Sequence, residues 1–239
     1  MNKVKNVLLV VMTVLVTIVS SANLGLINVD ASVVSSTASM QELATKMKKI
    51  DNQGLSKQLE NVIHKEVASK GLTLLETENV LEFEKLTLSK VDDYTIATIP
   101  YKNSETYNIM SNLSVVFDAS RNIINYSEQQ LTQSDHNTFW VKQSADGHVV
   151  LDKDLGTEYL SNTETLSGIN ELKKVSQTRG LDLKCFGAVV GAGAAVCATI
   201  AKLCGTPCAL TAVICGVCVG GIIVIGGGSI VGAIVACWK

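Results

Sequence analysis

The sequence predicts an α+β domain, built from an N-terminal helix and an antiparallel meander, followed by a small all-α apolar helical hairpin braced by disulfides. Helically spaced apolar residues come first, and short alternating segments separated by turn residues follow them. The last quarter of the chain is strongly apolar. It holds all seven cysteines, from Cys185 to Cys237, and eleven of the eighteen glycines. The chain therefore joins two physically different segments.

Charge is divided in the same way. Residues 32–180 carry 15 Lys and Arg against 20 Asp and Glu, a net charge of −5. Residues 181–239 carry three lysines and one aspartate, a net charge of +2. The whole chain has a formal charge of −2. We expect no nucleic acid among its partners, because such partners require a strongly basic surface.

The first 31 residues have the organisation of a signal peptide. Lys3 and Lys5 precede an apolar run from Val7 to Val19, and small residues suited to cleavage follow at Ala22 and Ala31. The apolar run is shorter than the roughly 20 residues of a transmembrane helix. We expect residues 1–31 to be cleaved, with an uncleaved anchor as the alternative, and the product to be secreted into a compartment where disulfides persist.

Residues 32–160 are expected to form a polar α+β domain. An apolar stripe predicts a helix over Met40–Ser69 with a break at Gly54, and the spacing then changes towards two. Six strands are predicted, at Leu81–Leu88, Tyr94–Tyr101, Leu113–Phe117, Ile123–Leu131, Thr138–Gln143 and Val149–Leu151. The Asp146-Gly147 pair predicts a tight hairpin turn, because both residue types tolerate positive φ angles.

This domain shows no catalytic or metal-binding pattern. His64, His136 and His148 stand far apart, and none has the spacing of a metal motif. The alternating glutamates between Glu76 and Glu84 are expected on the solvent face of a strand. No nucleophile-elbow motif or glycine-rich phosphate loop is present in the sequence. We therefore expect neither an enzyme nor a cofactor or metal site.

Residues 161–180 have the composition of an exposed linker. The segment is polar, and it ends in one of the two arginines of the chain, Arg179, followed by Gly180. Exposed polar segments are preferred sites of proteolysis. A processing site at Arg179 and Gly180 is the functional interpretation, and a plain linker with an incidental arginine is the alternative.

Residues 181–239 are expected to form two apolar helices of about 18 residues and a shorter third one, because glycine and proline punctuate the apolar runs. The runs are Cys185–Leu203, Ala209–Ile225 and Ile230–Trp238, separated by the CGTPC and GGG sequences. None has a polar face, and such helices lie in a core or in lipid. Three GxxxG pairs favour close helix packing in a membrane. We expect the membrane-facing residues of this segment to be Lys184, Lys202, Trp238 and Lys239.

The cysteines of this segment are disulfide candidates. They are Cys185, Cys197, Cys204, Cys208, Cys215, Cys218 and Cys237. A zinc site is the alternative, but export and apolar surroundings favour disulfides, which brace small exported domains. An odd count allows at most three internal bridges. Pairs that close the CGTPC turn, Cys197 or Cys204 with Cys208 or Cys215, are the natural candidates.

The organisation of the chain resembles that of halocin-like bacteriocin precursors. The resemblance rests on the signal segment, the polar middle and the stretch CFGAVVGAGAAVCATIAKLCGTPCALTAVICGVCVGGIIVIGGGSIVGAIVAC. The sporulation-delaying toxins are similar in organisation. The resemblance implies that the C-terminal part is an antimicrobial peptide and that the part before it can serve as its immunity protein.

The sequence therefore predicts a secreted precursor of a membrane-active, bacteriocin-like peptide, released by proteolysis near residue 180. Its expected partners are target-cell membrane lipids, a processing protease and, for the peptide, the pro-domain itself. The rival hypothesis is an exported cell-surface binding protein anchored by an uncleaved C-terminal hairpin. An enzyme with its site in the middle domain is a third hypothesis, which no catalytic constellation supports.

Overall fold

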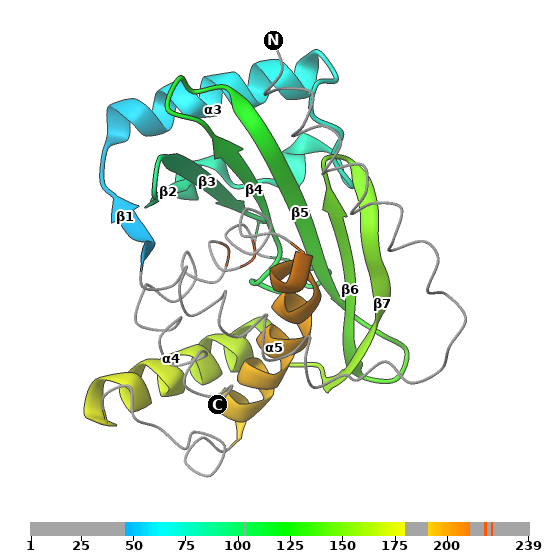
Figure 1. The fold of residues 1–239 in the computed structure, drawn as a ribbon. Coiled ribbons are helices and arrows are strands. Elements are labelled where there is room, and N and C mark those ends of the chain that lie inside the picture. Colours follow the sequence, from blue (N-terminus) through cyan, green and yellow to red (C-terminus); the bar gives the residue numbers. More distant parts are fainter. Residues whose placement is uncertain (1–45, 103, 180–190, 211–217, 219–220, 222–239) are drawn as a thin grey trace, which may run out of the picture. The chain divides into compact units, whose positions relative to one another are not determined.

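The computed structural model describes residues 46–102, 104–179, 191–210, 218 and 221, and only the backbone for residues 175–179 and 206–210 (Figure 1). Contacts divide the chain into two units, Met1–Ser32 and Val33–Lys239, and every described residue belongs to the second. The predicted signal peptide lies outside the described residues.

Helix α3, Gln53–Ala68, begins where the sequence supplies a capping side chain. The Asn52 carboxamide oxygen accepts a hydrogen bond from the Leu55 N–H at 3.0 Å, which satisfies one of the free donors of the first turn. Leu59 and Ile63 are buried one turn apart on the face that meets the sheet. The predicted helix was too long at its N-terminal end, because Lys48–Ile50 is strand β1, paired with β2.

The first predicted strand, Leu81–Leu88, is wrong over most of its length. Two short 3-10 turns, η1 at Glu78–Val80 and η2 at Phe83–Lys85, occupy the segment between α3 and the sheet, and β2 is Thr87–Val91. Val80, Phe83 and Leu86 pack against the core under α3. Their spacing of three matches a 3-10 turn, whereas the alternating glutamates suggested a strand. The glutamates therefore do not line one face of a strand.

The remaining strands form the predicted antiparallel meander. They are β3 Tyr94–Pro100, β4 Asn112–Phe117, β5 Ile123–Gln133, β6 Thr138–Ala145 and β7 His148–Glu158. The seven-stranded sheet follows chain order from β1 to β7, with every neighbouring pair antiparallel. Asp146 and Gly147 have φ angles of 47° and 78°, which confirms the tight β6–β7 turn. β7 extends well beyond its predicted end.

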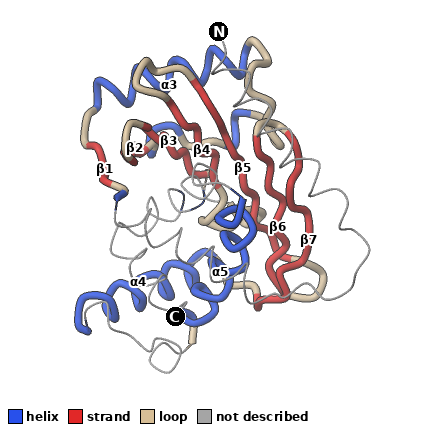
Figure 2. Tube along the Cα trace, viewed as in Figure 1, coloured by secondary structure: helices blue, strands red, loops and turns tan. Residues whose placement is uncertain are grey.

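The two faces of the sheet support two separate apolar cores. Figure 2 shows the helices that lie on either side of the strands. Along β3 and β4, successive side chains alternate between the two cores, so Val115 joins the core under α3 and Val116 the opposite core. The core under α3 also contains Leu59, Ile63 and Phe117. Helices cover both faces, which confirms a mixed α+β fold.

Helix α4, Asn162–Arg179, replaces the predicted linker. Ser161 and Glu164 form a capping box: the Ser161 N–H and hydroxyl donate to the Glu164 carboxylate at 2.9 and 2.7 Å, and the Glu164 N–H donates to the Ser161 hydroxyl at 3.3 Å. Ile169 and Leu172 are buried one turn apart. Two buried aliphatic residues are enough to pack this helix against the core. The rest of the segment is polar, and its composition therefore suggested a linker.

The predicted turn at CGTPC is wrong, because helix α5, Ala192–Leu210, includes this sequence. The helix continues through Gly205 and Pro207, although an internal proline costs a helix about 3 kcal/mol. Leu203 and Cys204, just before this point, are fully buried, and packing overrides the local preference. The predicted second and third helices lie outside the described residues, apart from Ala209 and Leu210, which end α5, and from Cys218 and Gly221.

Candidate functional site: the interface between α5 and the sheet

The apolar face of α5 is buried inside the fold. The buried apolar side chains fall on one helical face, because they stand at positions 0, 1, 4, 7 and 8 counted from the first of them. They are Val196, Cys197, Ile200, Leu203 and Cys204. Each is at most 4% exposed. In the intact chain, the first described helix of the segment expected to act on membranes is therefore part of the protein core.

The sheet supplies the surface on which α5 packs. Its contributing side chains are apolar, buried and drawn mainly from β5, β6 and β7. They include Leu131, Phe139, Val141 and Leu155, with Ile96 and Val116 from β3 and β4. A single cluster thus contains residues from the predicted pro-domain and from the predicted peptide.

Helix α4 crosses α5 on a glycine. A Cβ atom built on Gly168 would lie 2.5 Å from the carbonyl oxygen of Ala192 and 2.9 Å from a Val196 methyl group. Only a residue without a side chain permits so close an approach. Ile169 and Leu172 of α4 join the same core as α5.

A carboxylate of α4 binds the first turn of α5. Glu171 accepts a hydrogen bond from the Gly193 N–H at 2.9 Å. Free N–H groups and a partial positive charge mark the start of every helix, so a carboxylate there is stabilising. The two helices are therefore joined by a polar contact as well as by packing.

Strand β7 makes two polar contacts with α5. The Lys202 ammonium donates to the carbonyl oxygen of Leu155 at 2.7 Å. The hydroxyl oxygens of Thr199 and Thr157 lie 3.1 Å apart, and Thr199 is fully buried. Lys202, which the sequence predicts to face membranes, is exposed but uses its ammonium within the fold.

One disulfide is present in the described residues. It joins Cys204 of α5 to Cys218, and both cysteines are fully buried. The expected closure of a CGTPC turn is wrong, because α5 has no turn there and Cys204 points into the core, where Cys218 meets it. Cys197 is a buried free thiol, and burial raises its pKa to about 11.

The polar residues of the sheet lie next to the two described residues beyond α5. A Cβ atom built on Gly221 would lie 2.5 Å from the Asn112 amide nitrogen. The Cys218 sulfur lies 4.0 Å from the Gln129 carboxamide oxygen. Asn112 and Gln129 are buried, and each donates its amide to the Met110 carbonyl. Cys218 and Gly221 thus also lie against buried side chains of the sheet.

Most other predicted site residues lie outside the part of the chain that the structure describes. Those outside the described residues are Ala22, Ala31, Gly180, Lys184, Cys185, Cys215, Cys237, Trp238 and Lys239. Arg179 is the last residue of α4, and Cys208 lies in the last turn of α5. The predicted processing bond therefore falls at the C-terminal end of a helix.

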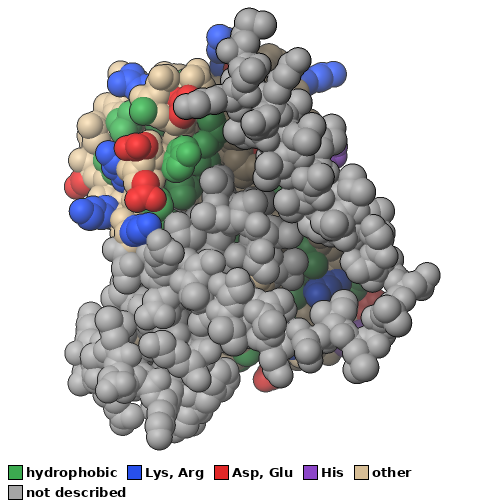
Figure 3. Space-filling model, in the orientation of Figure 1, with side chains coloured by type: hydrophobic (Ala, Val, Ile, Leu, Met, Phe, Trp, Pro, Cys, Tyr) green, Lys and Arg blue, Asp and Glu red, His purple; other side chains and the backbone are tan. Residues whose placement is uncertain are grey.

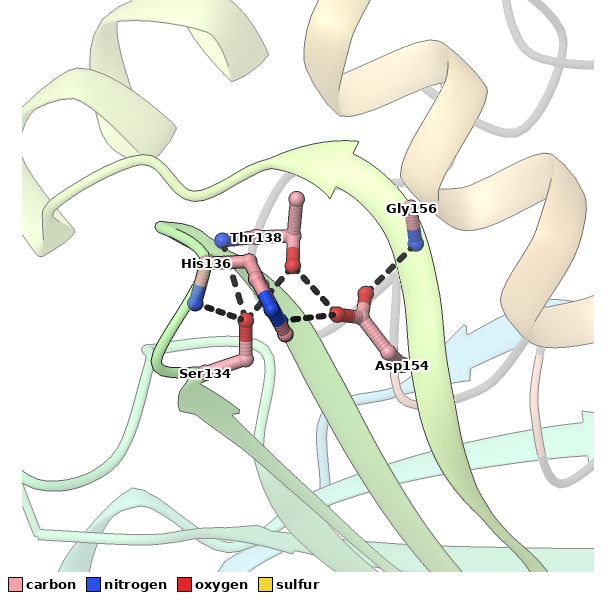
Figure 4. A network of polar contacts seen from close by, with 5 residues as sticks. All are labelled: Ser134, His136, Thr138, Asp154 and Gly156. Atoms are coloured by element: carbon pink, nitrogen blue, oxygen red, sulfur yellow. Dashed lines mark hydrogen bonds and ion pairs between the residues drawn. The ribbon is translucent and has the colours of Figure 1, made fainter.

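A serine, a histidine and an aspartate meet at the end of the β5–β6 hairpin (Figure 4). They do not form a catalytic triad. The Ser134 hydroxyl accepts from the backbone N–H of His136 at 3.1 Å, and the His136 ring lies 4.0 Å from the Asp154 carboxylate with an exposed side chain. A nucleophile needs its base within about 3 Å. The arrangement closes a turn instead.

Asp154 is the centre of this network (Figure 4). Its carboxylate accepts from the Thr138 hydroxyl at 2.6 Å and from the Gly156 N–H at 2.7 Å, and these bonds lower its pKa. Gly156 has a φ of 60°. The network thus shapes the segment of β7 that carries Leu155 and Thr157.

The sequence did not reveal a buried acid on the other face of the sheet. Glu128 is fully buried and accepts hydrogen bonds from the Tyr101 hydroxyl and the Leu75 N–H. Burial raises the pKa of Glu128 and also that of Tyr101. The cluster ties the loop after α3 to β5. A glutamate among the polar residues of a strand gives no sign of burial in sequence.

The described surface around α3 and β1 mixes both signs of charge with apolar side chains (Figure 3). Within the described part of the chain, no three His, Cys, Asp or Glu side chains gather as metal ligands. Among the helices described there, none combines the length and apolarity needed to cross a bilayer.

The strongest candidate site is therefore the α5 interface, where a cysteine-rich helix is buried against the sheet and α4. No protein-family model, curated protein or solved structure matches the chain.

Proposed function

We propose that the chain is a secreted precursor of a membrane-active, bacteriocin-like peptide, and that residues 46–179 cover that peptide until proteolysis near Arg179. The observation that supports this proposal is the burial of the apolar face of α5 in a core shared with the sheet and α4. A helix of this composition requires an apolar environment. The sheet provides one before release, and a bilayer provides one afterwards.

The size of the buried face gives the proposal an energetic basis. Five apolar side chains of α5 are buried, and burying each of the three aliphatic ones, Val196, Ile200 and Leu203, contributes roughly 2 kcal/mol. Exposing these three to water would thus cost on the order of 6 kcal/mol. A released segment has a strong tendency to bury this face again, in a membrane or against another apolar surface.

The same burial weighs against a cell-surface protein anchored by its C-terminal hairpin. An anchor must leave its apolar surface available to lipid while the rest of the chain stays folded. α5 instead completes the core on one face of the sheet. Its removal would open the core that also contains Phe139 and Val141, both now fully buried.

Processing is tested by mass spectrometry of culture medium with paired arginine variants. Cleavage after Arg179 yields a fragment of 60 residues, 180–239, lighter than its reduced mass by two hydrogens for each disulfide. Arg179→Gln should abolish this fragment. Arg121→Gln is the matched control, because Arg121 is the only other arginine and lies in an exposed turn. Medium that contains only the full-length chain would overturn the processing step.

Membrane action is tested on vesicles that contain anionic lipid and a trapped dye. The fragment 180–239 should release the dye, whereas the uncut chain from residue 32 onward, at equal concentration, should release little, because α5 is covered. Equal leakage from both would contradict the covering role. An uncut chain found in the membrane fraction of cells would support the anchored alternative instead.

A further inference from the structure

Strand β7 bulges towards α5. Thr138 pairs with Glu158, and Trp140 pairs with Asp154. One residue of β6 therefore faces three residues of β7, 155–157, which form the bulge. Such an insertion redirects backbone and side-chain groups out of the ladder. Here it directs the Leu155 carbonyl and the Thr157 hydroxyl to α5.

Hydrogen bonds among Asp154, Gly156 and Thr138 hold the bulge in shape. Asp154 holds the Gly156 N–H and the Thr138 hydroxyl with its two carboxylate oxygens (Figure 4). Gly156 takes a φ of 60°, which other residues adopt only under strain. A Cβ atom built on Gly156 would lie 4.0 Å from the Lys202 ammonium, an ordinary contact, so the backbone conformation and not a lack of space requires glycine here.

We infer that the bulge of β7 is a latch that fixes the register of α5 on the sheet. Apolar packing drives burial but is non-directional, so a helix that is apolar on most faces can slide or rotate on an apolar surface. Lys202 and Thr199 lie three residues apart on α5 and engage carbonyl and hydroxyl groups two residues apart on β7. Such polar pairs select one register among many.

The latch holds α5 against the sheet in the uncut chain, the state that the proposed function requires before cleavage. Only the later release of α5 rests on the proposed function. Asp154 is a positioning residue, since it acts through the backbone of the bulge. Lys202 and Thr199 make the contacts. The latch can therefore be opened from the sheet by changing Asp154, or from the helix by changing Lys202.

Hydrogen exchange followed by peptide mass spectrometry on the uncut chain tests the latch. Asp154→Ala and Lys202→Met should each speed the exchange of amides in 192–203 by about tenfold, the effect of one lost charge-assisted hydrogen bond. Exchange in α3, on the opposite face, should not change. This readout separates a freed α5 from a loosened domain.

Two matched controls isolate the latch. Asp152→Ala removes a carboxylate from the same strand, where it accepts from the Trp140 indole N–H rather than shaping the bulge. Lys57→Met removes an exposed lysine from α3. Both should leave α5 exchange as in the native chain.

The latch is overturned if Asp154→Ala and Lys202→Met leave exchange in α5 unchanged. It is also overturned if α3 and α5 accelerate equally in Lys202→Met, whose side chain is exposed and outside the sheet. Because the chain is uncut and no membrane is present, this result does not depend on processing or vesicle leakage. Failure of the latch would leave the proposed function standing, and the reverse also holds.

Discussion

Gly168 of α4 lies directly against the carbonyl of Ala192, at the start of α5. A Cβ at Gly168 would come within 2.5 Å of that oxygen and 2.7 Å of its carbon. Both atoms belong to the backbone, so no side-chain rotation can relieve the contact. The close approach of the two helices, and with it the covering of α5, depends on this one missing side chain.

Gly168→Ala should therefore destabilise the fold by about 1–3 kcal/mol, the usual cost of overpacking, despite the better helix propensity of alanine. Gly205→Ala is the control, because it is also helical and its added Cβ meets nothing within 4 Å. That change should stabilise the protein by about 0.5–1 kcal/mol. Urea unfolding followed by circular dichroism measures both. A loss of stability in both variants would contradict the crossing geometry.

Removing the Cys204–Cys218 disulfide should cost about 3 kcal/mol, because the bridge closes a loop of 14 residues and restricts the unfolded chain. The double variant Cys204→Ala, Cys218→Ala avoids leaving a single reactive thiol. Cys197→Ala, which removes a buried but unbridged sulfur, should cost no more than about 1 kcal/mol. Guanidinium unfolding compares the two. Similar losses would indicate that burial of sulfur, rather than the bridge, stabilises α5.

Cys197 should resist alkylation in the intact chain. It is 4% exposed, and its pKa of about 11 keeps it as a thiol at pH 8. Since the thiolate is the reactive form, iodoacetamide should modify this residue only after unfolding. Peptide mass spectrometry locates the label. Rapid labelling of Cys197 in the folded, uncut chain would show that α5 does not stay docked.

Glu128→Gln should flatten the pH dependence of stability above pH 4.5. Burial raises the folded-state pKa of Glu128, so the folded form binds its proton more tightly than the unfolded chain does. This contribution is fully present below the unfolded pKa of about 4.5 and is lost as the pH rises through the folded pKa. A glutamine cannot ionise, so the variant escapes this loss.

Thermal unfolding of both proteins between pH 4 and pH 8 measures the effect. The native chain should lose stability relative to Glu128→Gln as the pH rises, because the buried carboxyl becomes charged. Glu105→Gln, at an exposed position, should follow the native profile. If the difference between Glu128→Gln and the native chain stays constant with pH, Glu128 does not titrate with a raised pKa.

Local patterns predicted the meander well. Tyr94–Pro100, Asn112–Phe117 and Thr138–Ala145 are close to the strands expected from alternation, and Asp146-Gly147 forms the expected turn. Alternation and turn chemistry are encoded within a few residues, so no distant contact is needed to read them. The prediction was wrong where one pattern fits two structures, as in the 3-10 turns around Phe83.

The capping box at Ser161 and Glu164 is a local signal that could have predicted α4. Its apolar stripe is short, with Ile169 and Leu172 as the buried aliphatic residues, and the net polarity of the segment suggested a linker instead. The burial of Glu128 had no such signal. It depends on Tyr101 and Leu75, which are far from it in sequence.

By itself, the sequence determined that the chain joins a polar α+β part to a cysteine-rich apolar part, because composition and periodicity are properties of short segments. Only the tertiary structure decided that α5 completes the core of that α+β part, that Cys204 pairs with Cys218, and that Lys202 is held by β7. These relationships join residues distant in sequence. An apolar helix can be buried against any apolar surface, and the fold determines which surface it meets.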